Sequence, residues 1–171
     1  DLHKKLNENC QFISVKSVKN GQFCLSEHKI RLIKYKKIIE IPLEDIKLIL
    51  RKSRYHLLTA IELQTYDGKS FFIDFFKEKV LNRVINALNK NTFVQTKAFA
   101  DHFNQLNLTS QWKSRKITTF EYLMYLNVYS GRSFHELSQY PLFPWILNDY
   151  STDIDFNCIH DDIFRAFDTP L

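Results

Sequence analysis

The sequence predicts an α+β fold in which a seven-stranded antiparallel roll with a C-terminal helix is followed by helical and extended segments. Seven short runs of alternating or β-branched apolar residues before residue 76 predict the strands, and one apolar helical face follows them. Capping residues and prolines then indicate helical and extended segments beyond residue 117. The 171 residues, 44% of them apolar, make one domain or a small domain plus part of another and exclude a disordered chain.

The seven predicted strands are separated by turn residues and contain no helical interruption. They cover residues 11–18, 21–25, 29–35, 37–41, 46–50, 59–66 and 69–75. Asn20-Gly21 and Asp67-Gly68 predict tight type I′ turns, because these residues tolerate positive φ. Short connections of this kind favour a meandering antiparallel sheet.

A helix is predicted over residues 77–91, with Asp74 as a plausible N-cap. Its apolar face consists of Val80, Leu81, Val84, Ile85 and Leu88. Such a face can cover the open end of a barrel, and seven strands with a covering C-terminal helix indicate a pleckstrin-homology (PH)-type roll.

Charge is distributed unevenly along the chain. Residues 1–100 hold 19 Lys and Arg against 10 Asp and Glu, whereas residues 101–171 hold 5 against 9. The basic half is either a docking face for anionic material or a set of solvated lysine-rich strands. Lys16, Lys29 and Arg31 fit a loose Lys-xn-Lys-x-Arg pattern for anionic lipid contact, but a short first hairpin leaves no cradle loop. The basic cluster at residues 51–55 is either a solvated loop or a partner-facing site.

The last seventy residues are rich in aromatic side chains. Residues 96–106 predict a short connecting helix, and Thr118 with Glu121 forms a capping-box pattern that starts a helix ending near Gly131. This helix is apolar on all sides, so it needs partners all round. A second capping-box pattern at residues 133–136 predicts a short helix to Gln139.

The segment Tyr140–Leu147 is predicted to be stiff and extended. Pro141 and Pro144 remove two backbone donors and disfavour helical geometry at the residues that precede them. Its aromatic residues either thread a core or line a groove for a peptide.

Residues 112–124, 126–127, 131–133, 137–147 and 149–150 together resemble the opening of a BEACH domain. The most specific part is Gln139-Tyr140-Pro141-Leu142-Phe143-Pro144-Trp145, which is similar to the family's Gln-Tyr-Pro-x-Phe-Pro-Trp segment. Thr119 stands where the family usually has Asn. Residues 164–170 resemble a further family segment but lack its Asp and Lys.

The resemblance implies a PH-like domain at 1–95, a connecting helix or linker at 96–110 and the N-terminal portion of a BEACH domain at 111–171. It implies a non-catalytic scaffold acting in membrane trafficking, vesicle fusion or fission, or autophagy, whose PH-like and BEACH units form a groove for protein partners. The remainder of the BEACH domain and unknown proteins are the expected partners. The residues expected to make partner or interdomain contacts are Arg51, Arg54, Tyr55, Trp112, Arg115, Tyr140, Phe143 and Trp145.

Other functions find less support in the sequence. Neither a phosphate-binding glycine loop, a nucleophile elbow nor a metal-ligand spacing occurs, so we expect no enzyme, no cofactor and no metal. The basic residues lack an RNP-like aromatic pattern, which argues against nucleic acid. Three widely spaced cysteines favour a reducing, cytoplasmic location. The trafficking function that the resemblance implies adds an expectation of peripheral association at endomembranes. A membrane-surface or phosphoinositide-binding PH module, with weak peripheral membrane association, is the alternative function.

Overall fold

A computed structural model describes residues 6–90, 99–151, 153 and 163–164. The chain forms two compact units, residues 1–141 and residues 142–171, and each is described by itself. The larger unit contains the elements β1 (Leu6–Ser14), β2 (Ser17–Leu25), β3 (Lys29–Lys34), β4 (Lys37–Pro42), η1 (Leu43–Asp45), β5 (Ile46–Arg54), β6 (Leu57–Thr65), β7 (Ser70–Asp74), α1 (Glu78–Asn89), α2 (Phe99–Leu106), α3 (Leu108–Lys113), α4 (Thr119–Tyr129) and η2 (Leu137–Gln139).

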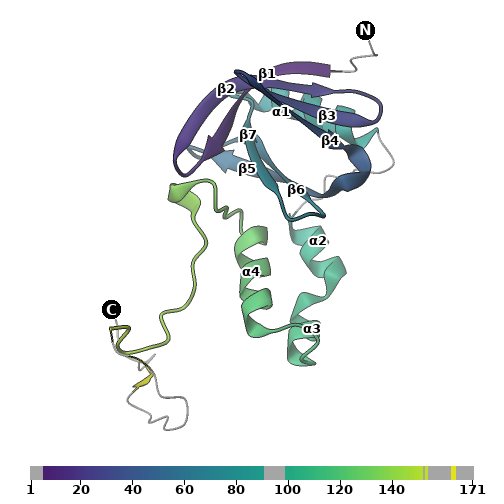
Figure 1. Ribbon diagram of the computed structural model, residues 1–171. Coiled ribbons are helices and arrows are strands. Elements are labelled where there is room, and N and C mark those ends of the chain that lie inside the picture. Colours follow the sequence, from purple (N-terminus) through teal and green to yellow (C-terminus); the bar gives the residue numbers. More distant parts are fainter. Residues whose placement is uncertain (1–5, 91–98, 152, 154–162, 165–171) are drawn as a thin grey trace. The chain divides into compact units, whose positions relative to one another are not determined.

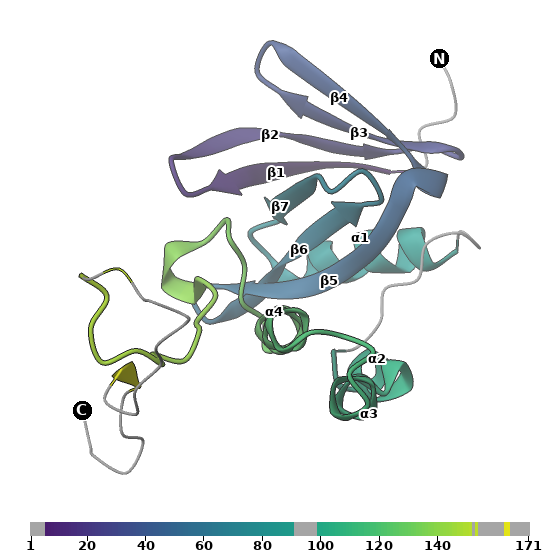
Figure 2. The same cartoon turned by 60° about the horizontal axis from the view of Figure 1, so that its bottom comes forward.

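The strands form one antiparallel sheet with the order β4-β3-β2-β1-β7-β6-β5 (Figure 1). Consecutive strands pair along two meanders, β1 to β4 and β5 to β7, and the pairing of β1 with β7 joins them. The sheet curls but does not close, and α1 lies over it against β6 and β1 (Figure 2). The predicted α+β class and PH-like roll are therefore confirmed.

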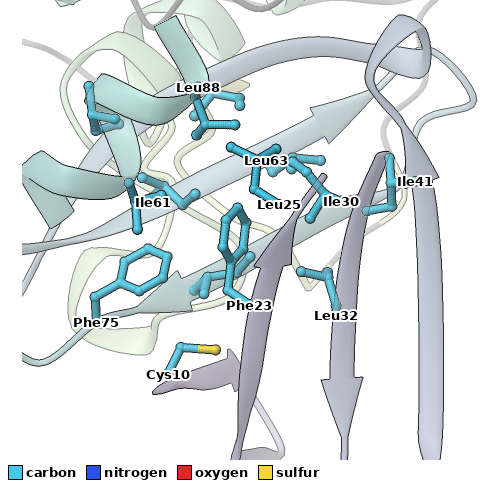
Figure 3. Packing of buried hydrophobic residues seen from close by; sticks show 14 of the residues in the cluster. Cys10, Phe23, Leu25, Ile30, Leu32, Ile41, Ile61, Leu63, Phe75 and Leu88 are labelled. Carbon is cyan, nitrogen blue, oxygen red and sulfur yellow. The ribbon is translucent and has the colours of Figure 1, made fainter. Parts of the chain in front are cut away.

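The hydrophobic core fills the concave side of this sheet. Figure 3 shows Phe23 and Phe75 meeting beside Ile61 and Leu63, and their rings are 5.5 Å apart at 84°, an edge-to-face pair. Helix α1 contributes Leu81, Val84, Ile85 and Leu88, which are almost fully buried, as its apolar pattern predicts. Burial of this face fixes the helix on the sheet.

Asp74 does not cap α1, so that prediction is wrong. The N-cap residue is Lys77, which makes no side-chain capping bond. Asp74 Oδ1 instead accepts a hydrogen bond from Phe76 N at 3.0 Å, and Asp74 Oδ2 forms an ion pair with Arg54 Nη1 at 3.2 Å. The buried Arg54 guanidinium thus engages the Asp74 carboxylate, which lies four residues before α1 begins at Glu78.

The first hairpin turn lies at Val15–Lys16 and not at the predicted Asn20-Gly21. Gly21 is inside β2, where a Cβ atom would lie 2.1 Å from Ile33 O and 2.6 Å from Phe12 Cε2. The glycine thus serves a close approach of backbone to backbone rather than a turn. A glycine in a tight turn and a glycine at a close backbone contact look alike in the local sequence, which explains why Gly21 was predicted to lie in a turn.

A type I′ geometry occurs instead in the β5–β6 turn, which the sequence does not predict. Tyr55 and His56 both have positive φ, at 49° and 66°. A bulky residue with positive φ lowers the free energy of unfolding by about 1 kcal/mol relative to glycine at the same position. The Asp67-Gly68 turn is present, but among its residues only Gly68 has positive φ, at 83°, so it is not type I′.

The helical part partly follows the prediction. The capping box of α4 is present, with Glu121 N donating to Thr118 Oγ1 at 3.1 Å and Thr118 N donating to Glu121 Oε2 at 2.7 Å. Gly131 has φ 89° just after this helix, as expected. The second capping box is wrong: only the three-residue η2 forms there, and Ser133 Oγ accepts from His135 N. Helix α3 was not predicted.

Residues 140–146 are neither helix nor strand, as predicted, and Tyr140 has extended geometry with φ −65° and ψ 145°. None of the described peptide bonds is cis. In the smaller unit a bridge pairs Leu147 with Phe164. Of residues 164–170, which carry part of the BEACH resemblance, only Phe164 lies inside the described part, and Cys158 also lies outside it. None of the described helices is long and apolar enough to cross a membrane.

The close approach at Gly21 makes a testable prediction. Gly21→Ala should lower the free energy of unfolding by about 3 kcal/mol, because its Cβ atom would overlap Ile33 O, a backbone atom that cannot easily move. Gly68→Ala is the control, since its Cβ would meet nothing within 4 Å and only the positive φ would cost about 1 kcal/mol. Urea unfolding followed by circular dichroism measures both, and equal losses would contradict the packing explanation.

Candidate interaction surface

The convex face of β5 and β6 carries a fully buried lysine. Lys52 Nζ lies 3.1 Å from Glu62 Oε2 and donates to Arg132 O at 2.6 Å and to Val128 O at 3.5 Å. Glu62 also accepts from Ser70 Oγ at 2.8 Å. The ammonium group therefore joins the sheet to the carbonyl end of α4, where the helix dipole favours a positive charge.

Burial lowers the pKa of Lys52, and the Glu62 carboxylate opposes this shift. Three contacts of Lys52 and two of Glu62 keep both charges satisfied, which a buried ion pair requires. Burial also lowers the pKa of His135, which lies in the segment between α4 and η2. Lys52 and Glu62 are thus buried, and the segment between α4 and η2 that meets them is partly buried.

Arg54 is a second buried cation on the same face. Its Nη1 donates to Gln11 Oε1 at 2.8 Å and to Asp74 Oδ2 at 3.2 Å, and its Nη2 donates to Tyr55 Oη at 3.2 Å. The Arg54 guanidinium also lies 4.8 Å from the centre of the Tyr55 ring. Its Nε has no hydrogen-bond partner in the described part of the chain, although Glu136 Oε2 is 3.9 Å away.

A third contact joins the same two regions, since Gln139 Nε2 donates to Ser53 O at 2.9 Å. We call the set Lys52, Ser53, Arg54, Glu62, Arg132, Glu136 and Gln139 the β5 junction. It brings the predicted residue Arg54 to the segment that follows α4. Arg51 is half-buried on β5, and Tyr55 is 73% exposed at the adjacent turn.

Trp112 and Tyr122 form a separate aromatic pair between α3 and α4. Their rings stack at 4.8 Å and 3°, Trp112 Nε1 donates to Thr119 Oγ1 at 3.1 Å, and Tyr122 Oη is 3.1 Å from Thr109 Oγ1. Arg115 follows with φ 57°, and it lines a shallow pocket with Trp112 and Thr118. These contacts fix the entry to α4.

The remaining predicted aromatic residues are largely exposed. Tyr140 is 42% exposed and packs edge-on against Phe134 at 5.3 Å, while its carbonyl accepts from Arg132 Nη1. In the smaller unit Phe143 and Trp145 are 43% and 54% exposed, and Trp145 lies 6.1 Å from Tyr150. Within the larger unit, the structure brings Arg54 against Tyr55 and places Trp112 and Arg115 in the lining of one pocket.

Of the three residues predicted for anionic lipid contact, Lys29 and Arg31 lie together and Lys16 lies apart from them. Lys29 and Arg31 on β3 both engage Glu40, at 2.8 and 2.6 Å, and these bonds lower the pKa of that carboxyl. Lys16 lies at the opposite end of β2, about 25 Å away along a nine-residue strand.

Sequence reasoning missed Lys52, Glu62 and Gln139, which make the closest contacts of the β5 junction. A signal was available for the first two, because β-strand alternation places Lys52 on the same face as Leu50, which is also fully buried. No group of three or more potential metal ligands occurs among the residues that the structure describes.

The β5 junction joins the PH-like roll to the aromatic-rich helical segment that follows it. Residues 110–171 match the family model of the Beige/BEACH domain. The chain belongs to the BEACH family.

Two curated relatives extend this finding over the roll. The chain is 38% identical over 112 residues to "BEACH domain-containing protein lvsE" of Dictyostelium discoideum, which covers 60% of this chain and 5% of that protein. It is 31% identical over 143 residues to "Putative neurobeachin homolog" of Caenorhabditis elegans, covering 75% of this chain and 6% of that protein. The chain thus spans about one-twentieth of the length of these relatives.

Among solved structures, the C-terminal domain of an unknown protein from Leishmania infantum resembles the chain with a TM-score of 0.43 at 17% identity. The match covers 50% of this chain and 83% of that one.

The buried ion pair of the β5 junction can be tested by substitution. Lys52→Met should lower the free energy of unfolding by about 3–5 kcal/mol, because it leaves Glu62 charged, buried and without its cation. Lys52→Met combined with Glu62→Gln should recover part of that loss, and exposed Lys47→Met should change stability by less than about 0.5 kcal/mol.

Urea unfolding provides these values, and limited proteolysis reports separately on residues 130–140. Faster cleavage there in Lys52→Met is the expected sign that the junction has opened. If the single and double variants are equally unstable, Lys52 and Glu62 are not coupled.

Proposed function

We propose that this chain is a non-catalytic scaffold module of a large BEACH-family protein, and that it acts in membrane trafficking, vesicle fusion or fission, or autophagy through protein contacts. In this proposal residues 1–95 are a PH-like domain, residues 96–110 connect, and residues 111–171 begin the BEACH domain. The β5 junction is the observation that carries it.

The junction supports a scaffold because it holds two parts of the chain at a fixed register. Lys52 Nζ reaches Arg132 O across 80 residues of sequence, and Gln139 Nε2 reaches Ser53 O across 86. These bonds are partly buried, so solvent competes with them weakly. A fixed joint of this kind presents both surfaces to a partner at one angle, which lowers the ordering cost of binding.

The surface of α4 supports a further partner. The sequence of this helix is apolar on all sides, yet Phe120 is 64% exposed and Leu126 is 38% exposed. Leu137, shortly after the helix, is 65% exposed. We propose that the remainder of the BEACH domain of the parent protein covers these side chains, and that exposed Arg115, Tyr140, Phe143 and Trp145 contribute to the same or to neighbouring contacts.

Binding of this chain to the remainder of the BEACH domain, expressed from the parent reading frame, tests the proposal. Phe120→Ser with Leu126→Ser should raise the dissociation constant of the complex about tenfold to a hundredfold in isothermal titration calorimetry. The reason is that the complex no longer gains the free energy of burying these two apolar side chains. Tyr66→Ser is the matched control, since Tyr66 is 72% exposed in the β6–β7 turn.

Arg51→Glu with Tyr55→Ser tests the groove expected beside the β5–β6 turn. Arg54 is left intact in this test, because its buried pair with Asp74 makes it part of the fold. This pair of changes should weaken capture of a protein partner by the whole PH-like and BEACH assembly without weakening the assembly itself. Unchanged affinity in both sets of variants would overturn the scaffold proposal.

A further inference from the structure

The turns of the roll alternate between its two ends, because every strand is antiparallel to the next along each meander. The β1–β2 and β3–β4 turns share one end. Register places their residues together, since Gly21 of β2 is opposite Lys34 of β3, and Lys34 is opposite Lys37 of β4. Lys19, two residues before Gly21, therefore lies beside the β3–β4 turn.

Five lysines gather at this end, and we call them the lysine end: Lys16, Lys19, Lys34, Lys36 and Lys37. Lys34 is half-buried over the Phe12 ring at 4.5 Å, and its pKa is lowered by burial and by the charges of Lys37 and Lys19. The other four are exposed and form no ion pair with any described residue. Residues 14–20 and 33–39 contain no acidic residue.

Exposed apolar side chains lie among these lysines. Tyr35 is 88% exposed, Ile38 62%, Val18 49% and Val15 46%. Single exposed apolar residues are ordinary on protein surfaces, but four of them on two adjacent hairpin tips with five cations are not explained by solvation.

The β2–β3 turn and η1 lie together, since Leu43 N donates to His28 O, and they show no such excess of cations. Lys29 and Arg31 beside them pair with Glu40, at 2.8 and 2.6 Å. These two cations are thus compensated, whereas the four exposed lysines of the lysine end form no ion pair with a described residue. A large flat anionic surface would orient such a molecule with the lysine end toward it.

We propose that the lysine end docks on the surface of an anionic lipid bilayer, with Val15, Tyr35 and Ile38 entering the headgroup region and Lys16, Lys19, Lys36 and Lys37 contacting lipid phosphates and carboxylates. Mixed cationic and apolar tips fit a bilayer interface, where tyrosine is favoured and each nearby lysine contributes about 1 kcal/mol. Nucleic acid fits less well, because the tips offer only one aromatic ring for stacking.

The site differs from a headgroup cradle. The β1–β2 turn has two residues, too few to enclose an inositol phosphate, and Lys29 and Arg31 are engaged by Glu40 at the other end of β3. Attraction is therefore set by surface charge and by apolar insertion rather than by one stereospecific lipid.

Vesicle sedimentation of the 171-residue chain tests the proposal. We expect binding to vesicles of phosphatidylcholine with about 20% phosphatidylserine, weaker at higher salt, and little binding to phosphatidylcholine alone. Lys16→Gln with Lys36→Gln should weaken binding about thirtyfold. Lys47→Gln with Lys79→Gln removes the same net charge from other exposed positions and should change binding less than threefold, which is about 0.6 kcal/mol.

A second pair of variants tests insertion without changing charge. Val15→Ser with Tyr35→Ser should weaken binding about tenfold at physiological salt. All substituted side chains are exposed, so melting curves should match those of the unaltered chain.

Four results would overturn the proposal: equal losses in the two lysine pairs, no loss in Val15→Ser with Tyr35→Ser, equal binding to neutral vesicles, or binding to soluble inositol hexakisphosphate or a short oligonucleotide as tight as to anionic vesicles. The assay contains no BEACH remainder, so its outcome is independent of the scaffold proposal.

Discussion

The ammonium group of Lys52 is the constraint on which the arrangement of the larger unit depends. It is buried on the convex face of the sheet, so it needs acceptors from every side, and Glu62 alone cannot supply them. The carbonyls of Val128 and Arg132 complete its shell, and they are available because α4 ends there. The charge on β5 thus fixes where α4 must end, and Gly131 allows the chain to turn back toward η2 at that point.

Arg54 and Gln139 extend the same logic along β5. Arg54 links β5 to β7 and β1 through Asp74 and Gln11, so a shift of the edge strand would break contacts on three strands. Gln139 then ties η2 to the backbone of Ser53. The PH-like roll and the helical segment that follows it are consequently joined by partly buried polar bonds, which make a more directional connection than an apolar patch.

The sequence predicted the parts of this structure that depend on local patterns. Strand alternation, the apolar face of α1 and the Thr118–Glu121 capping box are properties of neighbouring residues, and all three are present. Gly21 was misassigned because glycine serves both turns and close backbone contacts. The contacts of Lys52 and Gln139 across the β5 junction were missed because they join residues 76 to 86 positions apart, and no local pattern reports such a contact. Arg54 was selected as a contact residue, but its burial depends on Asp74 across the sheet.

The β5–β6 turn has a consequence for how this chain tolerates change in length. Tyr55 and His56 connect the strands with only two residues, so the turn itself sets which faces β5 presents. Because side chains alternate along a strand, a slip of one residue would turn Lys52 and Arg54 into the apolar interior and bring Ile49 outward. One inserted or deleted residue at this tip would therefore do more harm than most substitutions there, and the tip is a poor place to attach a label or a fused peptide.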